Sequence, residues 1–202
     1  MGERRMAVHI YSGRFFMRTG YLTYLLMAVN VVVFLMETVA GGSGKTSVAR
    51  RFGAMYSGMP VRESWRYLTS MFVHFGGAHL ICNVWALYCL GPGIEMIFGE
   101  KGFFFIYFIS GLAGGLLTQL LWKIRRRNGI SAGASGAVFG LLGAYLVAAL
   151  YGFLTRAGLQ NILLSIVINL VYGFLNRRIN MAAHVGGFIA GLLTALVIAL
   201  LV

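Results

Sequence analysis

The chain has 202 residues, of which 59% are hydrophobic and only 11% are charged, and its formal net charge is +12. Soluble globular domains contain about 45–50% apolar and about 25% charged residues, so this composition excludes a soluble domain and indicates an integral membrane protein. The five acidic residues are all glutamates. The lack of aspartate excludes an aspartyl protease and any Ser-His-Asp triad.

Six apolar runs are long enough to cross a bilayer as helices, which takes about 20 residues each. They cover residues 21–39, 78–98, 102–122, 135–154, 159–175 and 183–202. The runs lack the period-two alternation of a membrane barrel, so we expect an all-α bundle of six transmembrane helices. Residues 1–20 would form a short amino-terminal segment, and residues 21–202 a single membrane domain.

The one long connection, residues 40–77, mixes aromatic side chains with arginines and includes the pair Trp65 and Arg66. This mixture is typical of segments that lie in the membrane interface. Residues 41–46 end like a phosphate-binding loop, but Val39 stands where the first glycine is required, so we expect a flexible loop and no nucleotide. The basic residues form short clusters between apolar runs, which favours membrane lipid over nucleic acid as their partner.

Four polar side chains fall inside apolar runs: His79 and Asn83 in the second, Ser135 in the fourth and His184 in the sixth. These runs cross in the same direction, so the four residues would lie near one membrane face. Such residues are candidate functional groups. Each also has a structural explanation, since a histidine can reach the interface, an asparagine can bond a neighbouring helix and a serine can cap a helix.

The surroundings of Ser135 and His184 favour a chemical role. Gly133 and Gly136 flank the serine and permit a sharp bend at a helix amino terminus, where free amides can bind a developing oxyanion. Glycines spaced four apart follow both Ser135 and His184, and such faces let helices approach closely. We therefore expect the Ser135 hydroxyl to lie within hydrogen-bond reach of the His184 ring.

Together these residues resemble the rhomboid family of intramembrane serine proteases over about residues 20–202. The shared motifs are G-x-S-G at residues 133–136, H-x-x-x-N from His79 to Asn83, Ala-His-x-x-Gly at residues 183–187, and Trp65-Arg66 in a long first connection. The resemblance implies a six-helix rhomboid fold. It also implies a serine endopeptidase that cleaves in or near transmembrane segments of protein substrates, without a cofactor or metal.

The resemblance also implies a role for each matching residue. Ser135 would be the nucleophile and His184 its general base, with no acidic third member, and the Ser135 amide with the side chains of His79 and Asn83 would form the oxyanion hole. The supporting residues would be Gly133, Ala134 and Gly136 in the serine loop, Phe139 stacked on the catalytic histidine, His74 ordering the loop and water, and Trp65 and Arg66 anchoring the first connection.

Two further expectations concern Glu95 and the orientation in the membrane. Glu95 matches a family glutamate that ties helix ends together. The family's bacterial members place the amino terminus in the cytoplasm and the active site toward the outer face, so we expect a multi-pass protein of a prokaryotic plasma membrane in that orientation. The positive-inside rule favours the reverse, because only six of the 17 Lys and Arg residues would then be cytoplasmic and eleven external.

Two alternatives from other classes remain. A catalytically inactive rhomboid-like protein that binds membrane clients would share the fold, but would typically lack the serine or the histidine. A small transporter would carry polar residues across the whole bilayer, whereas here they cluster at one face.

Overall fold

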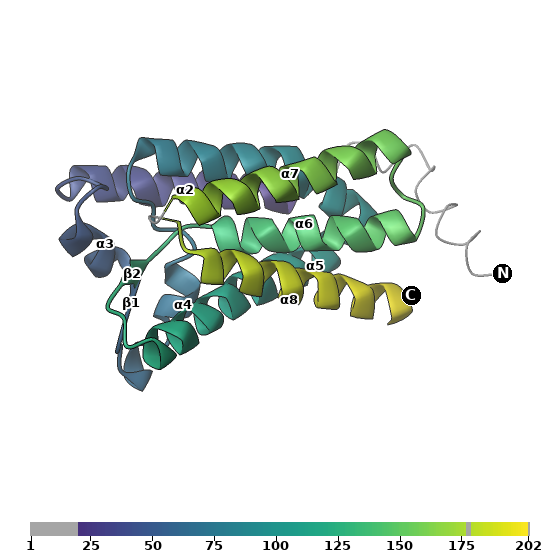
Figure 1. Cartoon of the computed structure of the whole chain (residues 1–202). Helices are drawn as coiled ribbons and strands as arrows, with labels where there is room; N and C mark the ends of the chain where they lie inside the picture. Colours follow the sequence, from purple (N-terminus) through teal and green to yellow (C-terminus); the bar gives the residue numbers. More distant parts are fainter. Residues whose placement is uncertain (1–19, 177–178, 202) are drawn as a thin grey trace.

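The computed structural model describes residues 20–176 and 179–201, and Figure 1 shows its long helices packed side by side. The long helices are Tyr21–Val39 (α2), Gly77–Ile124 (α5), Ser135–Leu150 (α6), Arg156–Leu175 (α7) and Met181–Leu201 (α8). By length and hydropathy, α2, α5, α7 and α8 can each cross a membrane. The predicted all-α integral membrane fold is confirmed. Of the expected amino-terminal segment, residues 1–20, the structure describes only Gly20. Val202, the last residue of the sixth predicted run, lies outside the described residues as well.

Helix α5 contains both the second and the third predicted spans. Its 48 residues are interrupted at Gly99, where φ is 72° and ψ is 170°, a conformation that glycine adopts most readily. Figure 1 shows the two halves of α5 running in opposite directions on different sides of α6. The six apolar runs thus all become helical, but two of them are halves of one bent element.

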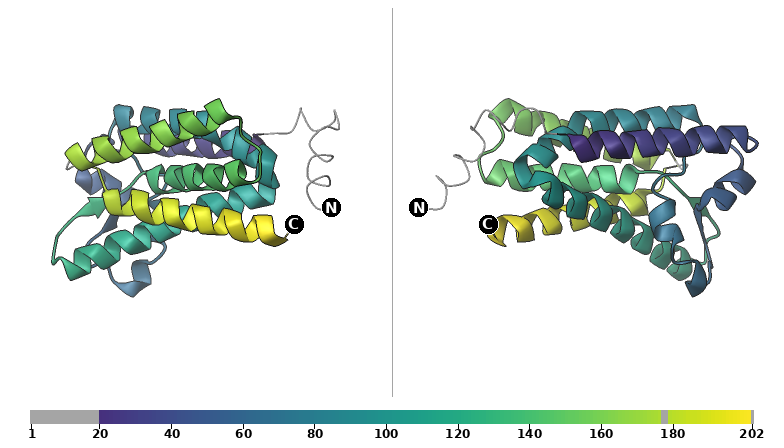
Figure 2. Two further views of the ribbon diagram at one scale, coloured as in Figure 1. Left: turned by 45° about the vertical axis from the view of Figure 1, so that its right-hand side comes forward. Right: turned by 180° about the vertical axis from the view of Figure 1, so that it is seen from behind.

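Helix α6 lies in the middle of the bundle in both views of Figure 2, and eleven of its 16 residues are buried. It ends at Leu150, four residues before the end of the predicted span. Gly152 has φ 79°, and the amides of Gly152 and Phe153 donate to the carbonyls of Ala149 and Ala148 at 3.1 and 3.0 Å, which is the Schellman pattern that ends helices. At 1.5 Å per residue α6 is about 24 Å long, shorter than the hydrocarbon core.

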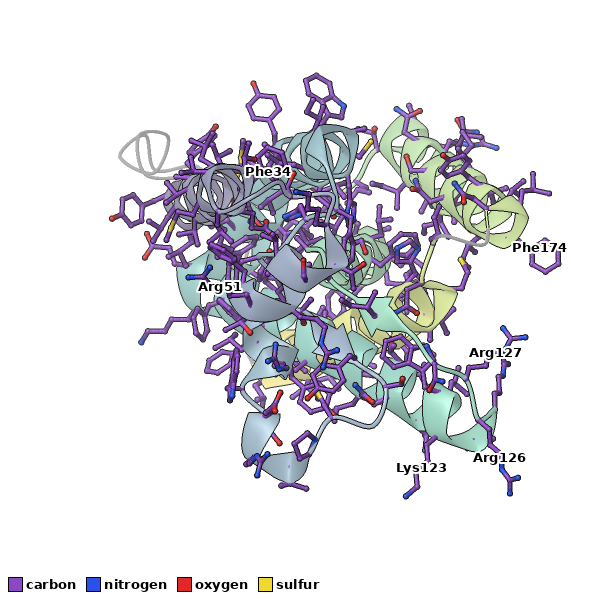
Figure 3. The ribbon with its side chains drawn as sticks, turned by 90° about the vertical axis from the view of Figure 1, so that its left-hand side faces the viewer. Phe34, Arg51, Lys123, Arg126, Arg127 and Phe174 are labelled. Atoms are coloured by element: carbon purple, nitrogen blue, oxygen red, sulfur yellow. The ribbon has the colours of Figure 1, made fainter. Side chains whose placement is uncertain are left out.

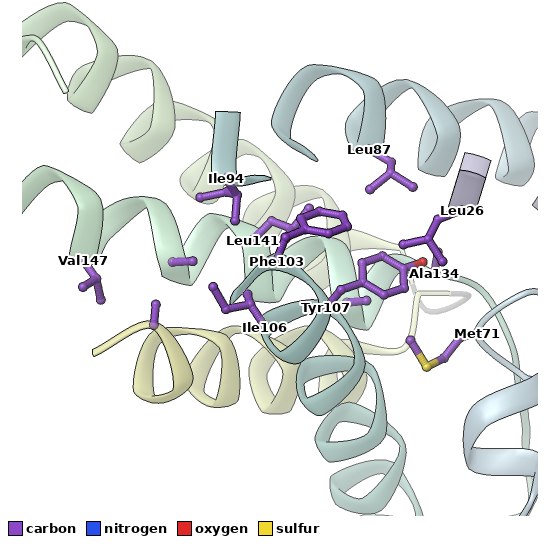
Figure 4. Close-up of a cluster of buried hydrophobic side chains, with 13 residues drawn as sticks. Leu26, Met71, Leu87, Ile94, Phe103, Ile106, Tyr107, Ala134, Leu141 and Val147 are labelled. Carbon is purple, nitrogen blue, oxygen red and sulfur yellow. The ribbon is translucent and has the colours of Figure 1, made fainter. Parts of the chain in front are cut away.

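The main hydrophobic core surrounds α6. Figure 4 shows Leu141 of α6 beside Phe103 of the second half of α5, with Ile106 and Tyr107 nearby and Val147 farther along α6. Each of these five residues is at most 2% exposed. The core therefore holds α6 in place beneath the membrane face where Ser135 lies.

The long first connection contains several short elements, and residues 41–45, where we expected a loop, lie between α2 and the first of them. They are α3 (Thr46–Phe52), β1 (Met55–Tyr56), a 3-10 turn (Val61–Glu63) and α4 (Arg66–Thr69). Strand β1 pairs antiparallel with β2 (Ile130–Ser131), which leads directly into the serine loop. The sequence did not predict this two-residue pairing, since so short a strand leaves no alternating pattern.

Glu95 fastens α2 to the bundle. Its carboxylate accepts hydrogen bonds from the amides of Leu22 and Thr23, both at 3.0 Å, and from the Thr23 hydroxyl at 2.8 Å. The first amides of a helix have no partner within the helix, and a carboxylate at that end is favoured by the helix dipole. The expected structural role of Glu95 is confirmed.

Candidate active site

Ser135 is the first residue of α6, at the end of a tightly bent loop. Gly133 has φ 119°, which disfavours any other residue there, and its amide donates to the Ser70 carbonyl at 2.8 Å. The helix cap is Ala134 rather than Ser135, and no side chain caps this end. The hydroxyl of Ser135 is therefore not used as a helix cap, and the helix amides beside it are not bonded to a capping side chain.

His184 lies in the first turn of α8 and is 7% exposed, so its side chain is enclosed by neighbouring residues. Its ring stacks on Phe139 of α6 with centroids 4.0 Å apart and planes 14° apart, as the resemblance implied. Between the described residues Ser135 and His184 the structure records no hydrogen bond. In unliganded enzymes, catalytic hydrogen bonds are often long and tighten only when substrate binds.

Close contact between glycine faces brings the two helix starts together. A Cβ built on Gly136 would lie 3.3 Å from the carbonyl oxygen of Ala183, and one built on Gly187 would lie 2.7 Å from the carbonyl carbon of Gly136. A Cβ on Gly191 would likewise collide with the backbone of Gly140. The residue after Ser135 thus packs against the residue before His184, which places the two side chains on adjoining turns.

His79 presents a hydrogen-bond donor to the serine loop. The amide of Phe75 donates to its Nδ1 at 3.3 Å, so in the neutral ring the proton is carried by Nε2. A Cβ on Gly133 would lie 2.7 Å from that Nε2, so this nitrogen faces the loop that carries Ser135. This arrangement suits a donor to an oxyanion.

Asn83 is 5% exposed and lies one turn after His79. Its Nδ2 donates to the His79 carbonyl at 2.8 Å, within α5, rather than to another helix. The amide retains a second N–H. Asn83 therefore both braces the turn that carries His79 and keeps a donor at the same depth.

His74 is fully buried beside His79, with the two rings edge to face and their centroids 5.0 Å apart. Its Nδ1 donates to the Phe72 carbonyl at 3.1 Å. Burial, helped by the neighbouring His79, lowers the pKa of His74 to about 4. His74 is thus held neutral at physiological pH and packs the loop that positions His79.

Two residues near the site were missed by the sequence analysis. Glu37 of α2 is fully buried, and its carboxylate accepts the amide of His74 at 3.1 Å. It could have been noticed as the single carboxylate in the first apolar run, by the same reasoning that singled out the histidines. It fixes the loop between α4 and α5.

Asn180 is the other missed residue, and it precedes the first residue of α8. Its Oδ1 accepts the amide of Ala183 at 3.3 Å, while its Nδ2 donates to the hydroxyls of Thr118 at 2.9 Å and Ser131 at 2.8 Å. Asparagine is a favoured helix cap, which is the signal that could have identified it. Asn180 joins the turn of His184 to α5 and to the strand before Ser135.

Trp65 and Arg66 brace the first connection from within. The Arg66 guanidinium pairs with the Glu63 carboxylate at 2.6 Å, donates to the Arg50 carbonyl at 2.7 Å, and lies 4.4 Å from the Trp65 ring centroid. The hydrogen bond from Arg66 lowers the pKa of Glu63, and the hydrogen bond from Tyr56 lowers it further. The pair lies outside the group formed by Ser135, His184 and His79.

The arrangement can support attack by a serine hydroxyl. A hydroxyl needs an adjacent base to become nucleophilic, and a buried imidazole lies on the adjoining helix turn. Donors aimed at the site where negative charge develops lower the barrier, and His79 is placed to be one. Within residues 20–176 and 179–201, no three His, Cys, Asp or Glu side chains gather to hold a metal ion.

Comparison with known proteins identifies relatives of this chain. Residues 61–200 match the family model described as Rhomboid domain. The chain is 38% identical over 152 residues to "Rhomboid protease GluP" of Bacillus subtilis (strain 168), covering 73% of this chain and 29% of that protein. It is 42% identical over 98 residues to "RHOMBOID-like protein 1" of Arabidopsis thaliana, covering 48% and 24%. It is 34% identical over 89 residues to "Putative rhomboid protease YdcA" of B. subtilis, covering 44% and 43%. The chain spans less than half the length of these relatives.

Proposed function

Because the chain belongs to the rhomboid family, we propose that it is an intramembrane serine endopeptidase, which hydrolyses peptide bonds in or near the transmembrane segments of membrane proteins. One observation carries the proposal. The glycine contact of Gly136 with Ala183 sets the first turn of α6 against the first turn of α8, with the His184 ring buried and stacked on Phe139.

In the proposed mechanism, Ser135 Oγ attacks the substrate carbonyl carbon while the His184 imidazole accepts the hydroxyl proton. The tetrahedral oxyanion is bound by the Ser135 amide and by the His79 and Asn83 side chains. The amine then leaves with the proton from His184, and an acyl-enzyme remains. A water molecule, deprotonated by the same imidazole, hydrolyses the acyl-enzyme and restores the serine. Loss of a single oxyanion donor costs about 2.7–4 kcal/mol of transition-state stabilisation.

No carboxylate is needed to orient the histidine in this proposal. In a Ser-His-Asp triad the acid fixes the imidazole. Here the Phe139 ring and the backbone around Asn180 would perform that task. Stacking on Phe139 would fix the plane of the imidazole, and Asn180 caps the turn that carries His184.

The location of the site near the start of apolar helices supports this substrate class. A transmembrane helix hides its carbonyls in its own hydrogen bonds, so the cleaved segment must first unwind into an extended stretch. Small or helix-breaking residues near the cleaved bond would assist this unwinding. The partners would therefore be membrane proteins and the surrounding lipid.

We further propose that the active site faces the outside of a prokaryotic plasma membrane, with the amino terminus in the cytoplasm. Two of the basic residues on the active-site face are engaged within the first connection, since Arg66 pairs with Glu63 and Arg50 lies 4.0 Å from the Tyr56 ring centroid. The Glu63 carboxylate thus compensates the charge of Arg66 on that face. A cysteine at the exposed Gly44, with Cys82 and Cys89 replaced, should react in intact cells with a membrane-impermeant thiol reagent. A site that reacts only after lysis would reverse the orientation.

Cleavage of a labelled transmembrane substrate by the purified protein tests the activity. Ser135→Ala and His184→Ala should each abolish cleavage, while Ser165→Ala, in the mostly exposed helix α7, should leave it unchanged. Cleavage that persists in the Ser135 and His184 variants would exclude the dyad. A well-folded protein that binds the substrate without cutting it would instead indicate an inactive client-binding member of the family.

A further inference from the structure

A cavity of about 660 Å³ lies between the first connection and the carboxyl end of α5. None of its lining residues belongs to the candidate active site. Three of them, Lys123, Arg126 and Arg127, are exposed cations, and Figure 3 shows their side chains projecting from the end of α5. The phenol of Tyr67 lines the same cavity from α4. The cavity therefore offers several donors and a concentrated positive charge to an anion.

The lining changes from aliphatic to cationic along α5. Leu116 and Leu120, which are 55% and 51% exposed, lie one turn apart on the helix and both line the cavity. Lys123 follows Leu116 by seven residues, a rise of about 10 Å. The headgroup region on each side of a bilayer is about 5–8 Å thick, so this rise crosses from acyl chains to headgroups. A free phosphate would gain no binding energy from the leucines. A lipid would place its acyl chains against the leucines and its headgroup beside the cations.

Arg126 occupies a position where glycine is usual. It has φ 48°, and it lies just after the helix end, where the amides of Arg126 and Arg127 donate to the carbonyls of Lys123 and Trp122 at 3.4 and 3.0 Å. This is the Schellman pattern, in which the left-handed residue is most often glycine. A bulky residue is disfavoured in that conformation. An arginine in this disfavoured conformation therefore points to a binding role for its side chain.

We propose that this cavity binds the phosphate group of an anionic glycerophospholipid, with Lys123, Arg126 and Arg127 around the headgroup and the acyl chains along Leu116 and Leu120. The lipid would hold the first connection against α5, because the cavity is lined by both. This site adds a specific lipid to the proposed function and does not depend on proteolysis.

Quenching of Trp122, which also lines the cavity, tests the proposal. Trp65→Phe and Trp85→Phe leave Trp122 as the sole tryptophan of the three in the chain. This protein is placed in phosphatidylcholine vesicles that contain a small fraction of brominated lipid, either phosphatidylglycerol or phosphatidylcholine. Brominated phosphatidylglycerol should quench Trp122 more strongly at equal mole fraction. Equal quenching by the two lipids would overturn the proposal.

Arg126→Gly separates binding from folding. The substitution relieves the left-handed arginine, so the melting temperature should stay the same or rise. The apparent affinity for phosphatidylglycerol should fall about fivefold, which is the share of one cation at an anionic surface. Unchanged affinity would overturn the role of Arg126. Native mass spectrometry of bound phosphatidylglycerol, with and without Arg126→Gly, makes the same comparison without replacing tryptophans.

A matched control removes charge outside the cavity. Lys45→Gln, Arg51→Gln and Arg62→Gln together remove three exposed cations of the first connection that do not line the cavity, and they should leave the selectivity for phosphatidylglycerol nearly intact. If they abolish it as fully as Lys123→Gln, Arg126→Gln and Arg127→Gln do, the attraction is general and the site is refuted. Inorganic phosphate, added at constant ionic strength, should not displace the lipid. Displacement would assign the site to free phosphate instead.

Discussion

Gly187 lets α8 approach α6 so closely that no side chain fits between them, and Gly187→Ala tests whether this contact assembles the active site. The added Cβ would lie 2.7 Å from the carbonyl carbon of Gly136, and closer still to its oxygen. Carbon atoms in contact are about 3.5–4.0 Å apart, so the helices must separate locally by about 1 Å. Overpacking of this kind typically costs about 1–3 kcal/mol of stability.

The expected loss of activity is larger than the loss of stability, because Gly187 lies one turn after His184 and faces the residue that follows Ser135. A displacement of about 1 Å in an active site can lower the rate about 100-fold. The assay is cleavage of a labelled transmembrane substrate, with the melting temperature measured on the same preparation. We expect kcat to fall more than KM rises, and the folded fraction to remain high at the assay temperature.

Gly158→Ala in α7 is the matched control for this substitution. Its added Cβ would lie 3.4 Å from the nearest atom, an ordinary contact, and alanine favours a helix over glycine by about 1 kcal/mol. Its activity and stability should equal or exceed those of the unsubstituted protein. Wild-type kcat in Gly187→Ala, or an equal loss in Gly158→Ala, would refute the account of how the helices bring the two side chains together.

Three other predictions concern residues around the site. Asn180→Ala should lower kcat, and the lost helix cap should lower stability by about 1 kcal/mol. Asn180→Asp keeps the cap oxygen and should therefore retain more stability than activity. Equal melting temperatures for the two variants would contradict the cap. Glu95→Gln should lower the melting temperature, since it leaves buried donors poorly paired at about 1–3 kcal/mol, but it should leave the rate per folded molecule unchanged. The folded-state pKa of His74 is about 4, below its ordinary value of 6.5. Between these two pH values the unfolded chain binds more protons than the folded protein. Stability should therefore fall by up to about 3 kcal/mol as the pH drops from 6.5 to 4. His74→Asn, which can still donate to the Phe72 carbonyl, should reduce this pH dependence in thermal unfolding, and an unchanged pH profile would exclude a buried neutral His74.

The sequence was sufficient to predict the features that rest on local patterns. The apolar runs predicted the helices, because hydrocarbon leaves the backbone few alternatives. The stacking of Phe139 on His184 and the role of Glu95 in tying helix ends together were both implied by the resemblance to the rhomboid family, and the structure places both residues accordingly. Even the early end of α6 has a local signal in Gly152, which the hydropathy of residues 151–154 concealed.

The remaining features depend on partners far apart in the chain. Glu37 and the amide it binds are 37 residues apart, and Asn180 and Thr118 are 62 residues apart. Single-chain patterns carry no record of such pairings, since either residue could equally be exposed or capped by a neighbour. The pairing of β1 with β2 was missed because strands of two residues leave no alternating pattern.

The central claim is that Ser135 is activated by His184, and covalent labelling tests it most directly. The purified protein is treated with a fluorophosphonate, and the modified peptide is identified by mass spectrometry. The account predicts a single adduct on Ser135, formed at a rate that falls at least about 100-fold in His184→Ala, while Ser165→Ala labels normally. An adduct on another residue, or undiminished labelling of Ser135 in His184→Ala, would contradict it.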